Sequence, residues 1–124
     1  MSKKILIIDA DQDIVEIIKF VLEDYTYKVT SSLSPDIVKE IPSIKPDLII
    51  LDDWLPVIKG RVVCKSLKSA QHTRHIPVIM LSDITDLEII AHDCLADDYL
   101  AKPFDILDLV NKIALVLKNN KVGM

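Results

Sequence analysis

Polar side chains follow four apolar runs of this 124-residue sequence, at the points where the runs end. Asp9 and Asp52 each close one run, Ser82 closes another, and Lys102 follows a fourth. In an open α/β sheet, ligands bind beyond the carboxyl ends of the strands. A single Asp at a strand end is often only the cap of the next helix. Four ends that carry two carboxylates, a hydroxyl and an ammonium group predict a polar site at one edge of a sheet.

These groups suit the transfer of a phosphoryl group onto a carboxylate. An Asp side chain can act as a nucleophile and form an acyl phosphate. The transfer needs a cation at the phosphoryl oxygens, and Mg²⁺ binds one or two carboxylates together with phosphate oxygens. A lysine supplies a second positive charge. A hydroxyl can hydrogen-bond the bound phosphoryl group and move its own loop when phosphate arrives.

The elements that must position these groups alternate along the chain. Aliphatic runs predict five strands, over Lys4–Asp9, Tyr27–Ser31, Asp47–Asp52, Ile76–Ser82 and Asp98–Ala101. Segments with helical character lie between them, over about 14–22, Pro35–Ile41, Gly60–Ser69, Asp86–His92 and Ile106–Lys118. The first has apolar residues at i, i+3, i+4, i+7 and i+8 from Ile14, with Asp11 or Asp13 as its N-cap. Pro42 and Pro46 are expected to end the second.

Strands that alternate with helices predict parallel pairing through right-handed crossovers. We therefore expect an α/β protein, a three-layer α/β/α sandwich around a five-stranded parallel sheet, and one domain over residues 1–124. Few residues are aromatic and half are hydrophobic, which suits strands buried on both faces. The spacing of the runs does not give the strand order.

Composition excludes several classes of function. The net charge of −4 argues against binding nucleic acid through a general positive field. No apolar run approaches the roughly 18 residues of a membrane span, and the apolar N-terminal stretch is too short for a signal peptide, so we expect a cytoplasmic protein. Cys64 and Cys94 lack metal-ligand or redox spacing and are interpreted as buried thiols. His72, His75 and His92 are interpreted as surface residues.

Several stretches together resemble a known family. They are ILIIDADQDI at 5–14, PDLIILDDWLP at 46–56 with Gly60, IPVIMLS at 76–82, and ADDYLAKPF at 96–104. Over essentially its full length, the chain resembles a two-component response-regulator receiver domain. The resemblance implies a flavodoxin-like receiver fold with strand order 2-1-3-4-5.

The resemblance also implies roles for particular residues. Asp52 would be the phosphoacceptor, and Asp9, Asp52 and the backbone carbonyl of Trp54 would bind Mg²⁺. Lys102 would pair with the phosphoryl group and precede a cis bond to Pro103.

Ser82 would be the switch hydroxyl and Tyr99 the aromatic switch. The face formed by residues 86–92, 98–101 and 106–118 would be the interaction surface. Such a protein is not an enzyme; its partners would be a histidine kinase or phosphotransfer protein and a downstream protein. Since the sequence ends soon after the last helix, we expect output through another protein or through a homodimer on this face, with no direct nucleic acid or membrane contact.

Four residues depart from the family pattern. Ala10 replaces the second metal-binding acid, which should weaken Mg²⁺ binding. Asp53 stands where an apolar residue is usual, and Asp83 where Ala or Gly is usual. Two unit charges about 4 Å apart interact with about 4 kcal/mol at an effective dielectric of about 20, so Asp83 opposes an incoming phosphate. Leu95 replaces a loop glycine, which predicts another path for that loop. Asp11, Asp53 or Asp83 is a candidate substitute ligand.

Two functions therefore stay open. The first is a working phospho-receiver. The second is a degenerate receiver, a protein-binding module in which Lys102 and Asp52 form a standing ion pair. An enzyme on the same fold is disfavoured, because an Asp-x-Asp phosphatase needs an acid where Trp54 stands. A flavin site needs a Ser/Thr/Gly-rich loop where residues 9–12 read Asp-Ala-Asp-Gln.

Overall fold

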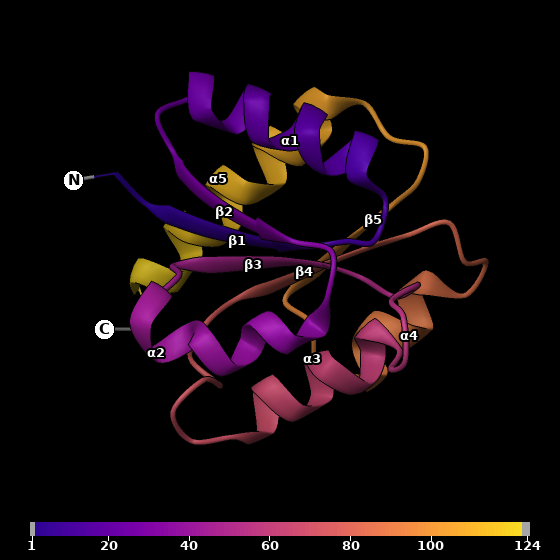
Figure 1. Cartoon of the computed structure of the whole chain (residues 1–124). Coiled ribbons are helices and arrows are strands. Elements are labelled where there is room, and N and C mark those ends of the chain that lie inside the picture. Colours follow the sequence, from indigo (N-terminus) through magenta and orange to yellow (C-terminus); the bar gives the residue numbers. More distant parts are fainter. Residues whose placement is uncertain (1, 123–124) are drawn as a thin grey trace.

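Strands and helices alternate along the chain, as Figure 1 shows. The computed structural model describes the backbone of residues 2–122 and the side chains of residues 2–120. The strands are β1 (Lys4–Ile8), β2 (Lys28–Ser32), β3 (Leu48–Asp52), β4 (Val78–Ser82) and β5 (Asp98–Ala101). The helices are α1 (Gln12–Asp24), a 3₁₀ helix (Pro35–Glu40), α2 (Ile41–Ile44), α3 (Gly60–Ser69), α4 (Leu87–Asp93) and α5 (Ile106–Val122).

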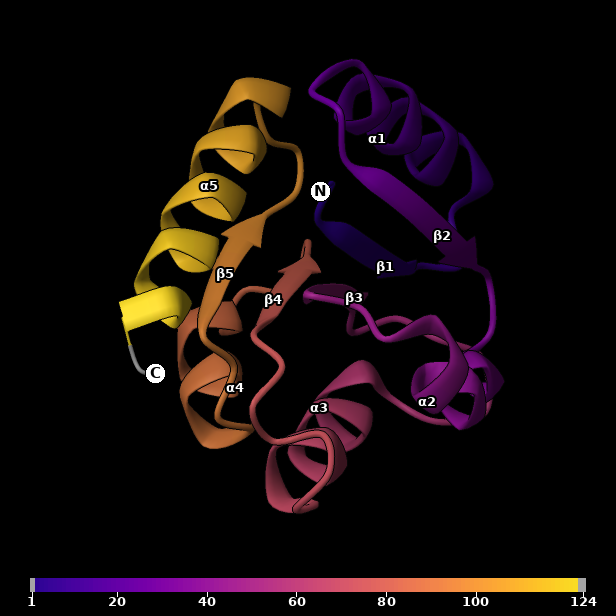
Figure 2. The same cartoon turned by 90° about the vertical axis from the view of Figure 1, so that its left-hand side faces the viewer.

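The sheet has the order β2-β1-β3-β4-β5, and every neighbouring pair is parallel. Helices α1 and α5 cover one face, and α2, α3 and α4 cover the other (Figures 1 and 2). The predicted three-layer sandwich and strand order are therefore confirmed.

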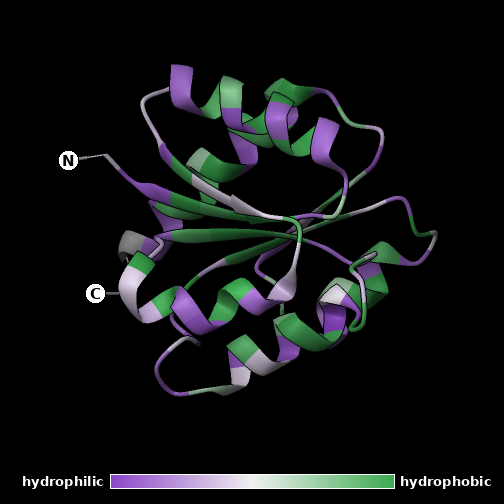
Figure 3. Cartoon of the chain, viewed as in Figure 1, coloured by the Kyte–Doolittle hydropathy of each residue, from purple (hydrophilic) through white to green (hydrophobic). Residues whose placement is uncertain are grey.

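Two apolar layers flank the sheet. The residues of β1, β3 and β4 point alternately into each layer, so Leu6 and Ile8 pack toward α3 while Ile5 and Ile7 pack toward α1 and α5. Because both faces are covered, the interior residues of these strands are apolar, at 5–8, 48–51 and 78–81, and the strands are mostly green in Figure 3. The edge strand β2 is only half buried and carries Thr and Ser.

Helix boundaries follow local chemistry at most places. Asp11 caps α1, since its Oδ1 accepts from the backbone N–H groups of Asp13 (3.1 Å) and Ile14 (3.3 Å). This confirms the predicted cap. Helix α3 has the predicted bounds, whereas α4 begins one residue later than predicted, after Asp86.

Two predicted helix ends are wrong. The second helical segment does not end at Pro42, because a 3₁₀ helix runs to Glu40 and α2 then carries Pro42 in its first turn. Proline is tolerated there, since its missing N–H would have no partner in the helix. The segment ends at Lys45, whose φ is 52°. Helix α5 continues past Lys118 to Val122, because lysine and asparagine do not stop a helix by themselves.

Within residues 2–122, no helix combines the length and the apolar character needed to cross a membrane.

Candidate functional site

The carboxyl ends of β1, β3 and β5 bring three charged side chains together. Lys102 Nζ lies 2.9 Å from Asp9 Oδ2 and 3.5 Å from Asp52 Oδ2. All three side chains are largely buried. Asp9 is held on its other oxygen as well, because Oδ1 accepts from the backbone N–H of Asp11 at 2.9 Å. The three side chains come together because β1, β3, β4 and β5 pair in parallel. This pairing aligns the last residues of the strands at one edge of the sheet.

A cavity of about 630 Å³ opens beside this cluster. Its walls come from the loops after β1, β3, β4 and β5, and they are Ala10, Asp11, Ile14, Asp52, Trp54, Asp83, Lys102 and Pro103. Three carboxylates and one ammonium group therefore face a space large enough for a phosphoryl group. The peptide bond between Lys102 and Pro103 is cis, as the family resemblance implies.

Asp52 carries a buried acceptor without a partner. Its Oδ1 has no hydrogen-bond partner among the described residues. Burial and the charge of Asp9 together raise the pKa of Asp52 to about 6, although the neighbouring Lys102 lowers it in part. Buried polar atoms are nearly always paired in folded proteins, so an orphaned oxygen at a cavity wall marks a place for a ligand.

Lys102 stays charged in this setting. Burial alone would lower its pKa, but the hydrogen bond to Asp9 and the charges of Asp9 and Asp52 raise it. One ammonium group thus neutralises part of the charge of two buried carboxylates.

Helix α3 begins directly against the end of β3. A Cβ atom added to Gly60 would lie 2.0 Å from the backbone oxygen of Asp52. This distance is a steric clash, so no residue with a side chain fits at this position. The Gly60 N–H donates to the backbone oxygen of Asp53 at 2.9 Å. Glycine is required here by close approach, and the contact fixes the distance between α3 and the candidate phosphoacceptor.

The loop between β3 and α3 covers the cavity with Trp54. The indole is about half exposed, and Lys59 Nζ lies 3.6 Å from the ring centroid. Val57 in the same loop is fully exposed at φ 72°, a left-handed conformation that a β-branched residue rarely adopts. The intrinsic backbone preference of Val57 therefore does not favour the conformation of this loop.

Asp53, one of the three candidate substitute ligands, is not among the residues that line the cavity. Its carboxylate is fully buried, and Arg61 binds both oxygens: Nη2 lies 2.6 Å from Oδ2, and Nε and the backbone N–H lie 3.0 Å from Oδ1. Burial would raise the pKa of Asp53, but these hydrogen bonds lower it. Asp11 and Asp83 are the two candidates that line the cavity.

Sequence reasoning did not find Arg61. The available signal was its position in the first turn of a helix that starts against β3.

Ser82 and Tyr99 lie near the site but do not line the cavity. Ser82 is buried at the end of β4, where its Oγ accepts from the backbone N–H of Ile84 at 3.3 Å. Tyr99 packs against the apolar layer on the α2–α4 side of the sheet, and Lys112 Nζ lies 5.9 Å from its ring. The roles of both as switch residues stay predictions.

The remaining sequence expectations have mixed outcomes. Cys64 and Cys94 are buried, and the three histidines are exposed, as interpreted. Leu95 adopts φ 67°, the left-handed conformation that glycine favours, so the loop keeps a glycine-like turn at this residue.

A cation at this site would need water or phosphate oxygens as ligands in addition to the protein's carboxylates. Within the described residues, no three His, Cys, Asp or Glu side chains gather as a metal-binding group. The unpartnered Asp52 Oδ1 fits a cation, and Asp9 fits one as well if Lys102 withdraws from it. Such a pair matches Mg²⁺, which takes one or two carboxylates and completes its shell with water and phosphate oxygens.

Comparison with known proteins agrees with this geometry. The family described as response regulator receiver domain matches residues 5–114. The chain belongs to this family.

Relatives of this receiver domain support the assignment. It is 34% identical over 126 residues to the alkaline phosphatase synthesis transcriptional regulatory protein PhoP of Bacillus subtilis. The aligned region covers 99% of this chain and 52% of PhoP. The chain thus spans about half the length of this curated relative.

Solved receiver structures share the fold. A CheY-like response regulator receiver domain protein from Methanospirillum hungatei superposes with a TM-score of 0.91 at 25% identity and covers all of both chains. A two-component response regulator from Clostridium difficile gives a TM-score of 0.85 at 29% identity, over 94% of this chain and 97% of the other.

Membership places the chain in two-component signalling. Receiver domains typically bind Mg²⁺, work with histidine kinases and are not enzymes in the ordinary sense.

Proposed function

We propose that this receiver domain accepts a phosphoryl group on Asp52 from a histidine kinase or phosphotransfer protein in the cytoplasm. The unpartnered, buried Oδ1 of Asp52 at the wall of the cavity is the observation that supports the proposal. Oδ1 attacks the phosphorus of a phosphohistidine, the P–N bond breaks, and the imidazole leaves with a proton. An acyl phosphate forms on Asp52.

Lys102 and Ser82 would hold the new phosphoryl group. The Lys102 ammonium group lies 3.5 Å from Asp52 Oδ2 and can turn from Asp9 to a phosphoryl oxygen. Ser82 would rotate its hydroxyl from the Ile84 amide to donate to another oxygen, and this would move the loop after β4.

Asp9, Asp52 and the carbonyl of Trp54 would hold Mg²⁺. The cation would supply positive charge to the phosphoryl oxygens during transfer. Ala10 contributes no carboxylate to this site, so the affinity for Mg²⁺ depends on fewer acids. Asp11 or Asp83 is proposed as the additional ligand, since both line the cavity.

Output would pass through the face formed by α4, β5 and α5, and Tyr99 of β5 would be its aromatic switch. The partner there would be a downstream protein or a second copy of the chain. Direct contact with nucleic acid is not part of the proposal, because the net charge is −4.

A second candidate is a degenerate receiver that binds proteins without phosphorylation. The hydrogen bond from Lys102 to Asp9 and its proximity to Asp52 favour it, because one lysine already neutralises the cluster without a cation. In this candidate the ion pair holds the loops in one state.

Intact-protein mass after incubation with acetyl phosphate distinguishes the two. For a phospho-receiver we expect the gain of one phosphoryl group in Mg²⁺, no gain in chelator, and no gain for Asp52→Ala. Asp36→Ala, at an exposed site in the 3₁₀ helix, is the matched control and should gain phosphate normally. A folded wild-type protein that stays unmodified in Mg²⁺ would instead support the degenerate receiver.

A further inference from the structure

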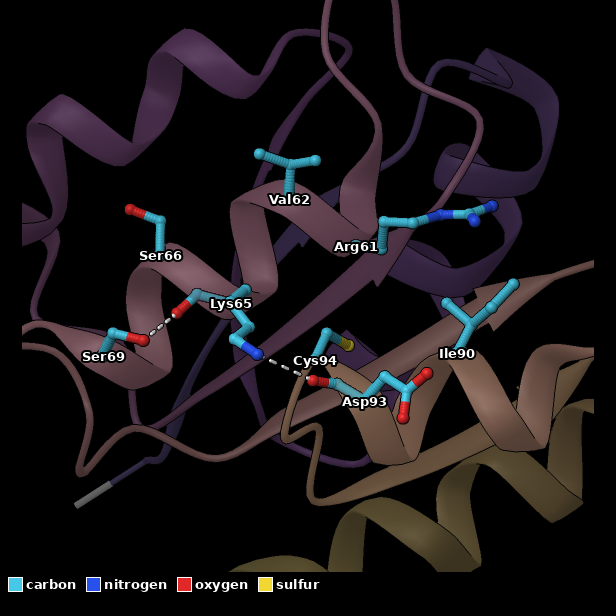
Figure 4. A pocket seen from close by; sticks show the side chains of 8 residues that line it. All are labelled: Arg61, Val62, Lys65, Ser66, Ser69, Ile90, Asp93 and Cys94. Atoms are coloured by element: carbon cyan, nitrogen blue, oxygen red, sulfur yellow. Dashed lines mark hydrogen bonds between the residues drawn. The ribbon is translucent and has the colours of Figure 1, made fainter.

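An open groove separates α3 from α4, on the sheet face opposite α1 and α5 (Figure 4). It has a volume of about 550 Å³, and its walls combine apolar side chains (Val62, Ile90) with charged ones (Arg61, Lys65, Asp93). Lys65 reaches across it and donates to the backbone oxygen of Asp93 at 3.3 Å. Cys94, the residue that follows α4, lies in the wall of this groove.

The second cysteine of the chain lies directly behind Cys94. Cys64 is fully buried in α3, and its Sγ donates to the backbone oxygen of Cys94 at 3.3 Å. The Cys94 thiol in turn donates to the backbone oxygen of Ala91 at 3.5 Å. The only two cysteines of a 124-residue chain, 30 positions apart, are therefore in contact.

The two thiols differ in access to the groove. Cys94 lies in its wall, whereas Cys64 is fully buried behind it. Contact with Cys64 also lowers the pKa of Cys94, while contact with Cys94 and burial raise the pKa of Cys64. Cys94 is therefore the nucleophile of the pair, because it is the thiol that a reagent in the groove reaches.

We propose that Cys64 and Cys94 form a redox-active pair, which a hydroperoxide entering the α3–α4 groove converts into an intramolecular disulfide. The Cys94 thiolate attacks the peroxide, the O–O bond breaks, and hydroxide leaves as Cys94 becomes a sulfenic acid. The Cys64 sulfur then attacks the Cys94 sulfur, and the sulfenic oxygen leaves as water with the Cys64 proton. In sum, two thiols and one hydrogen peroxide give one disulfide and two molecules of water.

The bond would tie α3 to the C-terminal end of α4. Sulfur atoms in a disulfide are about 2.0 Å apart, so the two helices must approach slightly and then lose freedom to shift against each other. Helix α3 is fixed to the strand end through Gly60 and Arg61, and α4 belongs to the proposed output face. This consequence rests on the proposed function, whereas the oxidation itself does not.

The pair is tested by treating the reduced full chain with hydrogen peroxide, alkylating the remaining thiols, and measuring intact mass. We expect a monomer that has lost two hydrogen atoms and takes up no alkylating agent, with peptides around Cys64 and Cys94 linked until a dithiol is added. Cys64→Ser should accumulate a sulfenic acid on Cys94 that a cyclic 1,3-dione traps. Cys94→Ser should react with peroxide at least about tenfold more slowly, because Cys64 is fully buried and does not line the groove.

Three results would overturn the proposal: dione labelling of both single variants at similar rates, disulfide-linked dimers in place of the internal bond, or no oxidation of the folded wild type. Unfolded wild type in denaturant is the positive control for reagent activity. Circular dichroism of each Ser variant shows whether it is folded, and Thr73→Ser, at a buried hydroxyl beside α3, is a matched control that should oxidise like wild type. None of these readouts requires phosphorylation, so they are independent of the function of Asp52.

Discussion

The charges around Asp52 determine how reactive its carboxylate is and how much its burial lowers the stability of the fold. Asp52 is 4% exposed, and its Oδ2 lies 3.5 Å from Lys102 Nζ. The same Nζ lies 2.9 Å from Asp9 Oδ2. Burial raises the pKa of Asp52 to about 6 from 3.8, so the folded protein holds this proton more tightly than the unfolded chain does. Stability therefore falls as pH rises between these two values, and the loss is complete at neutral pH.

Asp52→Asn should stabilise the fold at pH 7 in chelator, by about 1–3 kcal/mol. The amide keeps the shape of the side chain and removes the buried charge. The gain should shrink below pH 6 and vanish below about pH 4, where the wild-type carboxyl is protonated as well. Urea unfolding at several pH values measures it.

The matched control is Asp108→Asn, at an exposed site in α5, which should change stability little at any pH. A destabilised Asp52→Asn at neutral pH would contradict the charge balance described for the cluster.

Ala10 stands where the family resemblance implies a second metal-binding acid, and an acid there should strengthen cation binding. Ala10→Asp places a fourth carboxylate at the cavity wall, so the affinity for Mg²⁺ should rise by at least about tenfold. Trp54 lines the same cavity and is the only tryptophan, so its fluorescence during a Mg²⁺ titration reports the change.

Ala114→Asp, on an exposed part of α5, is the control and should leave the Mg²⁺ affinity unchanged. Equal affinity in wild type and Ala10→Asp would mean that Asp11 or Asp83 already fills the role.

At the scale of elements, α3 is fixed to the end of β3 by two contacts. Gly60 lets the helix touch the Asp52 backbone, and Arg61 binds the buried Asp53 in the same turn. The two members of this ion pair differ in exposure: the Asp53 side chain is fully buried, while 35% of the Arg61 side chain is exposed. Their removal should therefore have unequal effects.

Arg61→Met should destabilise the fold by about 3–5 kcal/mol, because it leaves an uncompensated charge in the core. Asp53→Leu should cost much less, since Arg61 can then turn to solvent and an apolar residue fills the buried site. Thermal and urea unfolding of both variants and of the double variant measures the difference. A larger loss for Asp53→Leu than for Arg61→Met would contradict this reading of the pair.

Element-level prediction from sequence succeeded where one physical signal dominates. The aliphatic runs predicted β1, β3 and β4 to within two residues, because burial on both faces leaves little choice of residue. The segment over 35–44 was less predictable, since Pro42 reads equally as a helix end and as a first-turn residue. The Asp53–Arg61 pair and the contact of Cys64 with Cys94 depend on tertiary packing, which no local pattern encodes.

At the scale of the whole molecule, the sheet separates two chemical environments. Its carboxyl edge gathers Asp9, Asp52 and Lys102, while its sides carry helices with apolar residues left on the outside. Ile89 of α4 is 60% exposed and Leu115 of α5 is 55% exposed, on the side proposed for output. Phe20 of α1 is 78% exposed and lies outside the face formed by α4, β5 and α5. Exposed apolar residues of this size favour contact with a partner.

If the output face binds a second copy of the chain, phosphorylation should promote dimers, and Ile89→Glu should weaken them. Burying one isoleucine side chain contributes about 1.5–3 kcal/mol, so its replacement by a charge should raise the dimer dissociation constant by about tenfold or more. Phe20→Glu is the matched control, because it places the same charge at a more exposed apolar site on α1 and should leave the dimer unchanged. Sedimentation equilibrium with and without acetyl phosphate and Mg²⁺ measures both variants. A monomer under every condition would assign the face to a different protein, and loss of the dimer in Phe20→Glu would assign self-association to the α1 side.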